Sequence, residues 1–448
     1  MIRAALALLA ALGPASAGVL AGDVYVYAGT LLAQAGSPTQ EHQTIVITDG
    51  RIAEIRAGYA VVPEGVRLID LSSSFVMPGL IDLHVHLTME PTPREFSSLV
   101  EDSDADLALI AAANARLTLA AGITTVVDLG RPGTPAHESA IFALRDAIAA
   151  GHVPGPRILA TGTPISVTGQ ERQPRLRSEI EPLVNSLAVC DGPDDCRRAT
   201  RRQVHNGADV ISFYDSASLL FPGQAGLPMT EEEMRAVTET AHGLGRKVIA
   251  DGHHASGVAA AIEAGVDAVD SVHLYEERTF DLVREADIYL QSHIYAVVAA
   301  VGDTPETLDQ GITWWHPRPV LERLFEIKNR PFAVIEAYRN GIRKIAFASD
   351  AGNFPHGQNA RDLVEFAARG IPAGEVLAIA TIHPARLLGL DHEIGALTPG
   401  KRADLIALGG NPLSDTSALL DVRLVMHDGR VPDPPRLRRD STAKAWRE

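Results

Sequence analysis

The stretch Val76-Met77-Pro78-Gly79-Leu80-Ile81-Asp82-Leu83-His84-Val85-His86-Leu87 is an apolar run that ends in two histidines one residue apart. In an extended strand, side chains two positions apart point to the same side, so His84 and His86 can present ring nitrogens to one point. Neutral imidazole binds first-row divalent ions well. The pair therefore indicates a metal site, although an isolated His-x-His is equally typical of the half-buried face of an ordinary strand.

Outward from this strand, short apolar segments alternate with alanine-rich segments, which is typical of βα units and a parallel sheet. Together with the His84 strand, eight strands are expected, the others being 124–128, 157–161, 208–213, 247–251, 268–272, 288–292 and 344–348. Helices are expected between them, for example at 105–121, 230–244 and 256–263. This α/β pattern predicts a TIM (β/α)8 barrel with its site at the carboxyl ends of the strands.

Both ends of the chain carry short β-type runs, at 23–27, 43–48, 51–55, 403–408 and 422–427. Asp49-Gly50 is a hairpin turn signal between two of them. We expect residues 18–77 and 392–432 to form one small β-sandwich-like domain beside a barrel spanning 78–391. Residues 433–448 lack an apolar period and are expected to be a loosely attached tail.

The composition favours a small-molecule enzyme. A chain of 448 residues is long enough for one large and one smaller domain. Its formal net charge of −16 argues against nucleic acid as a partner, because nucleic acid binding needs clustered cations. No segment offers the roughly 20 uninterrupted apolar residues of a transmembrane helix, so stable membrane insertion is not expected.

The chain begins with a pattern typical of export. Residues 1–17 combine Arg3, a short Ala/Leu-rich run and an Ala15-Ser16-Ala17 cleavage site, which predicts a signal peptide and a periplasmic or secreted protein. The two cysteines, Cys190 and Cys196, lie in one polar loop. An oxidising compartment would allow them to join, which favours a small disulfide over a metal site.

Further possible ligands follow the later strands. They are Asp251, His253, His254, His273, His293 and Asp350. Two histidines and an aspartate at the carboxyl ends of parallel strands provide what a catalytic metal with an open coordination position requires. For Asp350 a structural role as a helix cap or turn residue is the alternative.

The sequence resembles the amidohydrolase superfamily of metal-dependent hydrolases, in its imidazolonepropionase-like and prolidase-like branch. The resemblance lies in Pro78-Gly79 through His86, in Ile345-Ala-Phe-Ala-Ser-Asp-Ala-Gly352, and in the segments 381–389 and 395–405. It covers nearly the whole mature chain. It implies that Asp350 binds a divalent ion and takes the proton from the attacking water, with His84, His86, His253 and His273 as the other ligands.

Two of these ligands depend on register. Alignment with the family on 247–250 and 264–268 puts Asp251 and Ser271 where its histidines fall, whereas His253 and His273 each lie two residues later. A displacement of two preserves strand parity, so we expect His253 and His273 to be the ligands. Asp251 is the alternative ligand.

The chain also departs from the family. Ser212 stands where many binuclear members have a lysine that, carboxylated by CO₂, bridges two metals, and the loop 162–170 lacks a common histidine. Two cations within about 4 Å repel strongly without an anion between them. We therefore expect one ion, zinc by preference, although Tyr214 or Asp215 could substitute for the lysine.

These observations predict an exported metal-dependent hydrolase that cleaves an amide, peptide (including Xaa-Pro) or related C–N bond. Alternatives are a deaminase, a cyclic-amide or lactone hydrolase, and a binding protein without catalysis. A small molecule is the expected partner, and a homo-oligomer is compatible with the sequence. Candidates for substrate contact are Tyr214, His293, Tyr295 and His356. For Trp314-Trp315-His316 we favour hydrophobic packing over an exposed lid.

Overall fold

The computed structural model describes residues 23–95, 97–131, 135–168, 170, 188–216 and 229–432. The predicted signal peptide, residues 1–17, and the predicted tail, residues 433–448, lie outside the described residues.

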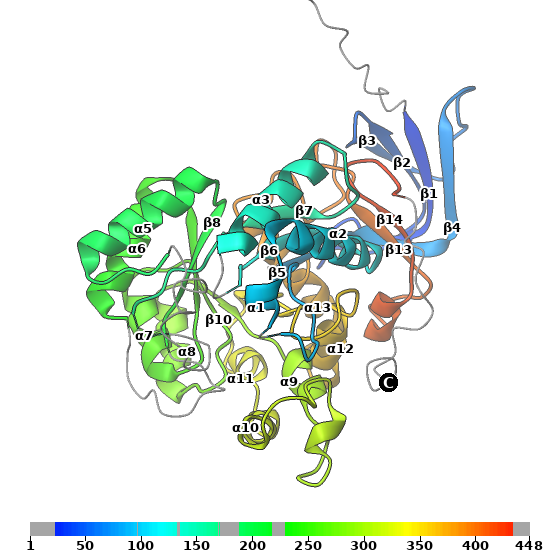
Figure 1. Ribbon diagram of the computed structural model, residues 1–448. Coiled ribbons are helices and arrows are strands. Elements are labelled where there is room, and N and C mark those ends of the chain that lie inside the picture. The colour runs from blue at the N-terminus through cyan, green and yellow to red at the C-terminus, as the bar shows by residue number, and fades with distance from the viewer. Residues whose placement is uncertain are drawn as a thin grey trace, which may run out of the picture.

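Both ends of the chain contribute strands to one six-stranded sheet, ordered β14-β13-β4-β1-β2-β3. Its strands are β1 (Val24–Leu31), β2 (Gln40–Thr48), β3 (Arg51–Ala57), β4 (Arg67–Pro78), β13 (Leu405–Leu408) and β14 (Val422–Met426). In Figure 1 this sheet lies at the upper right, on the far side of α2 and α3 from α5 and α6. The division of the chain into a barrel and a sandwich-like domain stays a prediction.

Eight further strands form two parallel sheets. The first has the order β5-β6-β7, and the second has the order β12-β11-β10-β9-β8. Their bounds are β5 Leu80–Val85, β6 Ile123–Asp128, β7 Arg157–Ala160, β8 Val210–Tyr214, β9 Lys247–Asp251, β10 Ala268–Asp270, β11 Tyr289–Gln291 and β12 Ile345–Ala346. All eight overlap predicted strands. A strand that is buried on both faces consists of a nearly continuous run of apolar residues, and such runs can be recognised in the sequence.

Backbone hydrogen bonds join the two parallel sheets along both of their edges. Beside β5, the Leu83 amide donates to the Phe347 carbonyl at 2.9 Å and the Asp350 amide donates to the His84 carbonyl at 2.9 Å. Beside β8, the Ile165 amide donates to the Ser212 carbonyl at 2.9 Å, and the Ile165 carbonyl accepts from the Tyr214 amide at 3.0 Å. β5 therefore lies next to the β12 segment.

The helices lie between the strands in the chain. They are α1 Ser98–Glu101, α2 Asp104–Ala120, α3 Pro135–Ala149, α5 Pro193–Asn206, α6 Glu231–Gly243, α7 Ala255–Glu263, α8 Glu277–Glu285, α9 Tyr295–Ala300, α10 Arg318–Lys328, α11 Ala333–Arg339, α12 Arg361–Ala368, α13 Ala373–Ile379 and α14 Ile382–Leu387, with 3-10 helices at Leu308–Gln310 and Thr416–Leu420. Capping boxes begin α2, at Ser103, and α6, at Thr230. Among the described helices, none is long and apolar enough to cross a bilayer.

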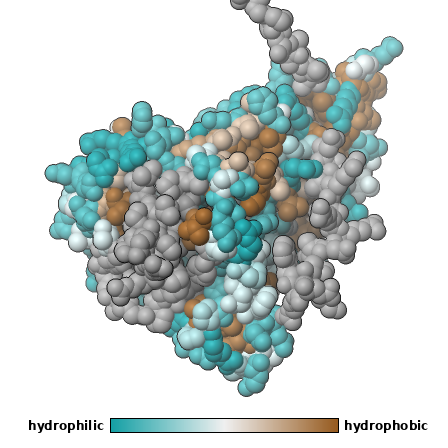
Figure 2. Space-filling view, in the orientation of Figure 1, coloured by the Kyte–Doolittle hydropathy of each residue, from teal (hydrophilic) through white to brown (hydrophobic). Residues whose placement is uncertain are grey.

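The Pro78-Gly79 pair fits the close approach of two strands. A Cβ on Gly79 would lie 2.2 Å from Thr124 Oγ1 of β6, so only glycine allows β5 to begin there. The predicted disulfide is confirmed, with Cys190 and Cys196 joined at 2.10 Å. Figure 2 shows a mainly hydrophilic face, on which apolar side chains gather near the middle and over the six-stranded sheet.

Candidate metal centre

Three buried side chains from two distant parts of the sequence converge beside the end of β5. The Nε2 atoms of His84 and His86 are 3.0 Å apart. Oδ1 of Asp350 lies 3.4 Å from the first and 3.2 Å from the second. All three residues are at most 8% exposed. Two imidazole nitrogens and a carboxylate oxygen therefore face one point.

The backbone sets this convergence. His84 lies in β5 and His86 follows directly after its last residue, so the two-residue period of the extended chain brings their rings together. Asp350 adopts a φ of 64°, which is strained for a residue other than glycine, with the strain typical of active sites. Its amide is held by the His84 carbonyl, and its Oδ1 accepts a hydrogen bond from Asn353 Nδ2 at 2.7 Å. At Gly352, a Cβ would lie 2.8 Å from the His86 Cβ.

Outer hydrogen bonds determine which ring nitrogens face the centre. His84 Nδ1 donates to Asp270 Oδ2 at 2.8 Å, and His86 Nδ1 donates to the Gly130 carbonyl. Because both acceptors require a proton on Nδ1, the Nε2 atom of each neutral ring is left with a lone pair. Two lone pairs and a carboxylate at these distances are stabilised by a cation between them. The donor set therefore fits a divalent metal ion.

The electrostatics of the site also favour a bound cation. Burial alone would lower the pKa of His84, but the carboxylates of Asp270 and Asp350 raise it to about 10. Burial would raise the pKa of Asp350, yet the imidazoles of His293, His84 and His86 hold it well below its usual range. The pocket thus favours positive charge beside an ionised carboxylate.

Three more histidines line the same cavity. His293 Nε2 lies 3.3 Å from Asp350 Oδ2 and 3.0 Å from His273 Nε2. The ring of His273 stacks on that of His253 at 5.4 Å. One oxygen of Asp350 thus faces His84 and His86, and the other oxygen faces His293. Because of this position, His293 is a potential metal ligand as well as the substrate contact that the sequence predicts.

The expected ligands His253 and His273 lie farther from the converging atoms. Among the described residues, the groups with ligand atoms within 4.8 Å of one another near β5 are His84-His86-Asp350 and His84-Asp270-His293. β9 ends at Asp251 and β10 at Asp270, and Ser271 has a φ of 60°. Both histidines therefore follow their strands in loops, and both line the cavity, as expected from strand parity. Their role as ligands stays a prediction.

The remaining predicted positions fall on the neighbouring strands. Asp251, the alternative ligand, ends β9 and pairs there with Asp270 of β10. Ser212 is buried within β8 and its Oγ has no hydrogen-bond partner among the described residues. Tyr214 ends β8 and lines the cavity. A Cβ on Gly252 would collide with the carboxylate of Asp215, which is buried between β8 and β9.

The cavity has a volume of about 190 Å³ and contains both groups of histidines. Tyr295 and His356 are not among the described residues that line it. The Tyr295 hydroxyl donates to Gln358 Oε1 at 2.8 Å. His356 Nε2 donates to the His86 carbonyl at 3.2 Å, and burial lowers its pKa to about 4. His356 thus contacts the backbone of His86 and not its ring.

Sequence reasoning missed two buried carboxylates. Asp270 orients His84, and Asp82 accepts hydrogen bonds from the Ser349 amide at 2.9 Å and from Asn359 Nδ2 at 2.8 Å. Burial raises the pKa of Asp82 to about 6, although these hydrogen bonds oppose the shift. Both residues lie in strands that were predicted to be buried, and a charged residue in such a strand is itself a signal of a specific partner.

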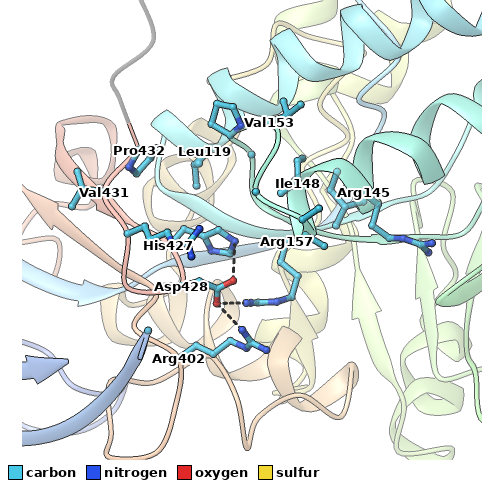
Figure 3. A pocket seen from close by; sticks show the side chains of 18 of the residues that line it. Leu119, Arg145, Ile148, Val153, Arg157, Arg402, His427, Asp428, Val431 and Pro432 are labelled. Carbon is cyan, nitrogen blue, oxygen red and sulfur yellow. Dashed lines mark hydrogen bonds and ion pairs between the residues drawn. The ribbon is translucent and has the colours of Figure 1, made fainter. Parts of the chain in front are cut away.

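A larger cavity, of about 780 Å³, lies between the six-stranded sheet and the helices α2 and α3 (Figure 3). Several of its charged groups are paired with one another. Arg157 contacts Asp404 at 3.0 Å and Asp428 at 2.7 Å, and Arg402 contacts Asp428 at 2.8 Å. Asp404, His427 and Asp428 could geometrically hold a cation, but the two guanidinium groups neutralise them. We interpret this cluster as a structural junction.

Comparison with known proteins identifies the class. Residues 75–431 match the model of the amidohydrolase family. The chain therefore belongs to the amidohydrolase family, and it is an enzyme that hydrolyses C–N bonds.

Several relatives resemble nearly the whole chain. Ochratoxinase of Aspergillus niger is 25% identical over 427 residues, which cover 90% of this chain and 84% of the relative. The structure of a Xaa-Pro dipeptidase with bound methionine has a TM-score of 0.81 and 29% identity, covering 92% of this chain and all of the other. A putative prolidase from Bifidobacterium longum has a TM-score of 0.74 and 26% identity, with coverages of 93% and 97%.

Proposed function

We propose that this chain is a metal-dependent hydrolase that cleaves an amide, peptide or related C–N bond with an activated water. His84, His86 and Asp350 would hold one divalent ion, with zinc favoured because two imidazoles and a carboxylate are typical catalytic zinc ligands. The observation that carries the proposal is the convergence of two imidazoles and one carboxylate, in which Asp270 and the Gly130 carbonyl fix the second nitrogen of each ring.

The chain's own residues divide the chemistry. A divalent ion, when bound, would lower the pKa of water and polarise the scissile carbonyl. Asp350 would accept the proton of the attacking water at Oδ2 and return it to the leaving nitrogen. Its lowered pKa keeps the Asp350 carboxylate ionised at neutral pH. His293, 3.3 Å from that oxygen, would orient it or assist the proton transfer.

The position of the site supports a closed barrel. We propose that the two parallel sheets form one eight-stranded (β/α)8 barrel, because β5 is hydrogen bonded to the β12 segment and β8 to Ile165. The centre would then lie at the carboxyl ends of the strands, where this fold carries its catalytic groups. The six-stranded sheet would be the small domain. One ion is favoured over two because Ser212 supplies no bridging anion.

Elemental analysis of protein purified without chelator tests the proposal. We expect about one divalent ion per chain, its removal by dipicolinate with loss of hydrolysis, and recovery of activity on adding zinc. The substrates tested would be N-acyl amino acid amides, N-acyl amino acids, Xaa-Pro dipeptides and lactones. A protein that takes up no ion contradicts the proposal and favours a binding relative. Cleavage of lactones alone would favour a lactone hydrolase, and release of ammonia alone would favour a deaminase.

The protein is further proposed to be exported to the periplasm or outside the cell. The leader pattern of residues 1–17 supports this, and so does the bond between Cys190 and Cys196, since disulfides persist in oxidising compartments. Mass spectrometry of the chain isolated from the periplasm or medium should find the first residue after Ala17. A cytosolic chain that retains Met1 would contradict export.

A further inference from the structure

One wall of the metal cavity is apolar and is built away from the barrel strands. It is formed by Met89, Val297, Ala300, Trp315, Leu324 and Ile327. Val297 and Ala300 belong to α9 and Leu324 and Ile327 to α10, so two short helices present aliphatic side chains toward the histidine cluster. Such a surface beside a polar reaction centre is typical of a subsite that holds a non-reacting part of the substrate.

The segment that carries Trp315 is fastened at both sides. The amides of Ile312 and Thr313 donate to the carbonyls of Ala299 and Ala300 at 3.0 and 3.2 Å. On the other side, His316 Nε2 lies 3.0 Å from Glu95 Oε2, which belongs to the segment after β5. The wall is therefore formed before a ligand arrives, and this reduces the entropy lost on binding.

The size of the cavity limits the group that the subsite can hold. Its volume is about 190 Å³. An apolar cavity of roughly 150 Å³ in another protein binds benzene, so one ring or a branched chain of similar volume is the upper size for this group. Larger side chains would require the wall to move.

The charges of the cavity disfavour an anionic substrate. Among its described lining residues are three carboxylates, those of Glu90, Glu95 and Asp350, and neither arginine nor lysine. The nearby Arg94 is paired with Asp102 at 2.8 Å and with Glu101 at 3.2 Å. Arg131 binds the Glu95 carbonyl and Ser98. No described cation is thus directed at a substrate carboxylate.

We propose that the substrate is an uncharged amide or related C–N compound that carries one compact apolar group, about a ring in size, next to its scissile C–N bond. Trp315 is the residue that selects this group. The inference rests on the proposed hydrolase function and narrows its substrate class. Among the described lining residues, neither arginine nor lysine is present to bind a free terminal carboxylate.

Binding and hydrolysis are measured separately with three probes. N-benzoylglycinamide is neutral with a ring, N-acetylglycinamide is neutral without one, and N-benzoylglycine is anionic with the ring. Isothermal titration calorimetry of the zinc-loaded full chain should give the first probe a Kd about tenfold lower than the other two, the size expected for one apolar group in a pocket. Where hydrolysis is detected, kcat/KM should follow the same order.

Two neighbouring tryptophans provide a matched pair of variants. Trp315→Ala should remove most of the preference for benzoyl over acetyl, and Trp315→Phe should keep it. Trp314→Ala is the control, because Trp314 lines a different cavity and not this one. Tighter binding of N-benzoylglycine, or an unchanged benzoyl preference in Trp315→Ala, would overturn the inference. Selective binding of N-benzoylglycinamide without any hydrolysis would instead keep the subsite and refute the proposed function.

Discussion

The Asp350 carboxylate unites the features of the site at the scale of single residues. It is buried, has a positive φ, and has one oxygen near His84 and His86 and the other near His293. A strained, charged group is costly to the fold, so its place among potential ligands indicates function.

Asp350→Asn tests this role with little change of shape. Asparagine tolerates the left-handed backbone region, so the variant should fold with a melting temperature close to the parent's. Loss of the anionic base should lower kcat by about 10²-fold or more. Circular dichroism and initial rates provide the measurements. A variant that folds and retains full turnover would show that another group accepts the proton.

Asp270→Asn tests the outer hydrogen bond to His84. Partners of this kind orient a ligand and raise its basicity, and their loss typically weakens metal binding about 10- to 100-fold. Competition with a fluorescent zinc chelator measures the affinity. Asp251→Asn is the comparison, since Asp251 pairs with Asp270 on the adjacent strand. A larger effect of Asp251→Asn would support Asp251 as the ligand, as the alternative alignment predicts.

At the scale of elements, the start of β5 depends on its contact with β6. Gly79→Ala would bring a Cβ to 2.2 Å from Thr124 Oγ1 within a buried sheet, and overpacking of this kind costs about 1–3 kcal/mol. Gly374→Ala in α13 is the control, because nothing lies within 4 Å of its added Cβ and alanine favours a helix. Urea unfolding should show destabilisation by the first change only; equal midpoints would contradict the predicted clash.

At the scale of the whole molecule, Arg157 of β7 forms ion pairs with Asp404, directly before β13, and with Asp428, after β14. Figure 3 shows Arg157 and Asp428 of this cluster. Asp404 is buried, and although burial raises its pKa, His427 and Arg157 together hold that pKa well below the usual range. A carboxyl with a lowered folded-state pKa stabilises the protein above its unfolded pKa of about 3.9, and this contribution is lost as the pH falls through the folded value.

Asp404→Asn should therefore destabilise the protein at pH 7 and flatten the acid limb of its stability curve. Breaking a buried ion pair costs about 3–5 kcal/mol at neutral pH, and the difference from the parent should shrink below about pH 4. Unfolding by urea between pH 3.5 and 8 measures it. Asp194→Asn is the control, since the Asp194 side chain is fully exposed. A parallel shift at every pH would contradict the ionic explanation.

Sequence reasoning went far with the fold and less far with the site. All eight parallel strands and the contribution of both chain ends to one sheet follow from local apolar patterns, because burial imposes a period on neighbouring residues. His84, His86 and Asp350 were identified from their residue types and from their positions at the ends of apolar segments. β9 ends at Asp251 as expected, whereas β10 ends at Asp270, two residues earlier than expected and directly before Ser271 with its positive φ.

The sequence by itself determined the family, the strand order along the chain and the residue types available for catalysis, since these depend on short segments. Only the tertiary structure decided which of them meet. Asp270 lies 186 positions from His84 yet contacts it at 2.8 Å, and Trp315 reaches the same cavity from outside the strands. Such contacts follow from how the strands and helices pack, and the local periodicity of apolar residues does not specify that packing.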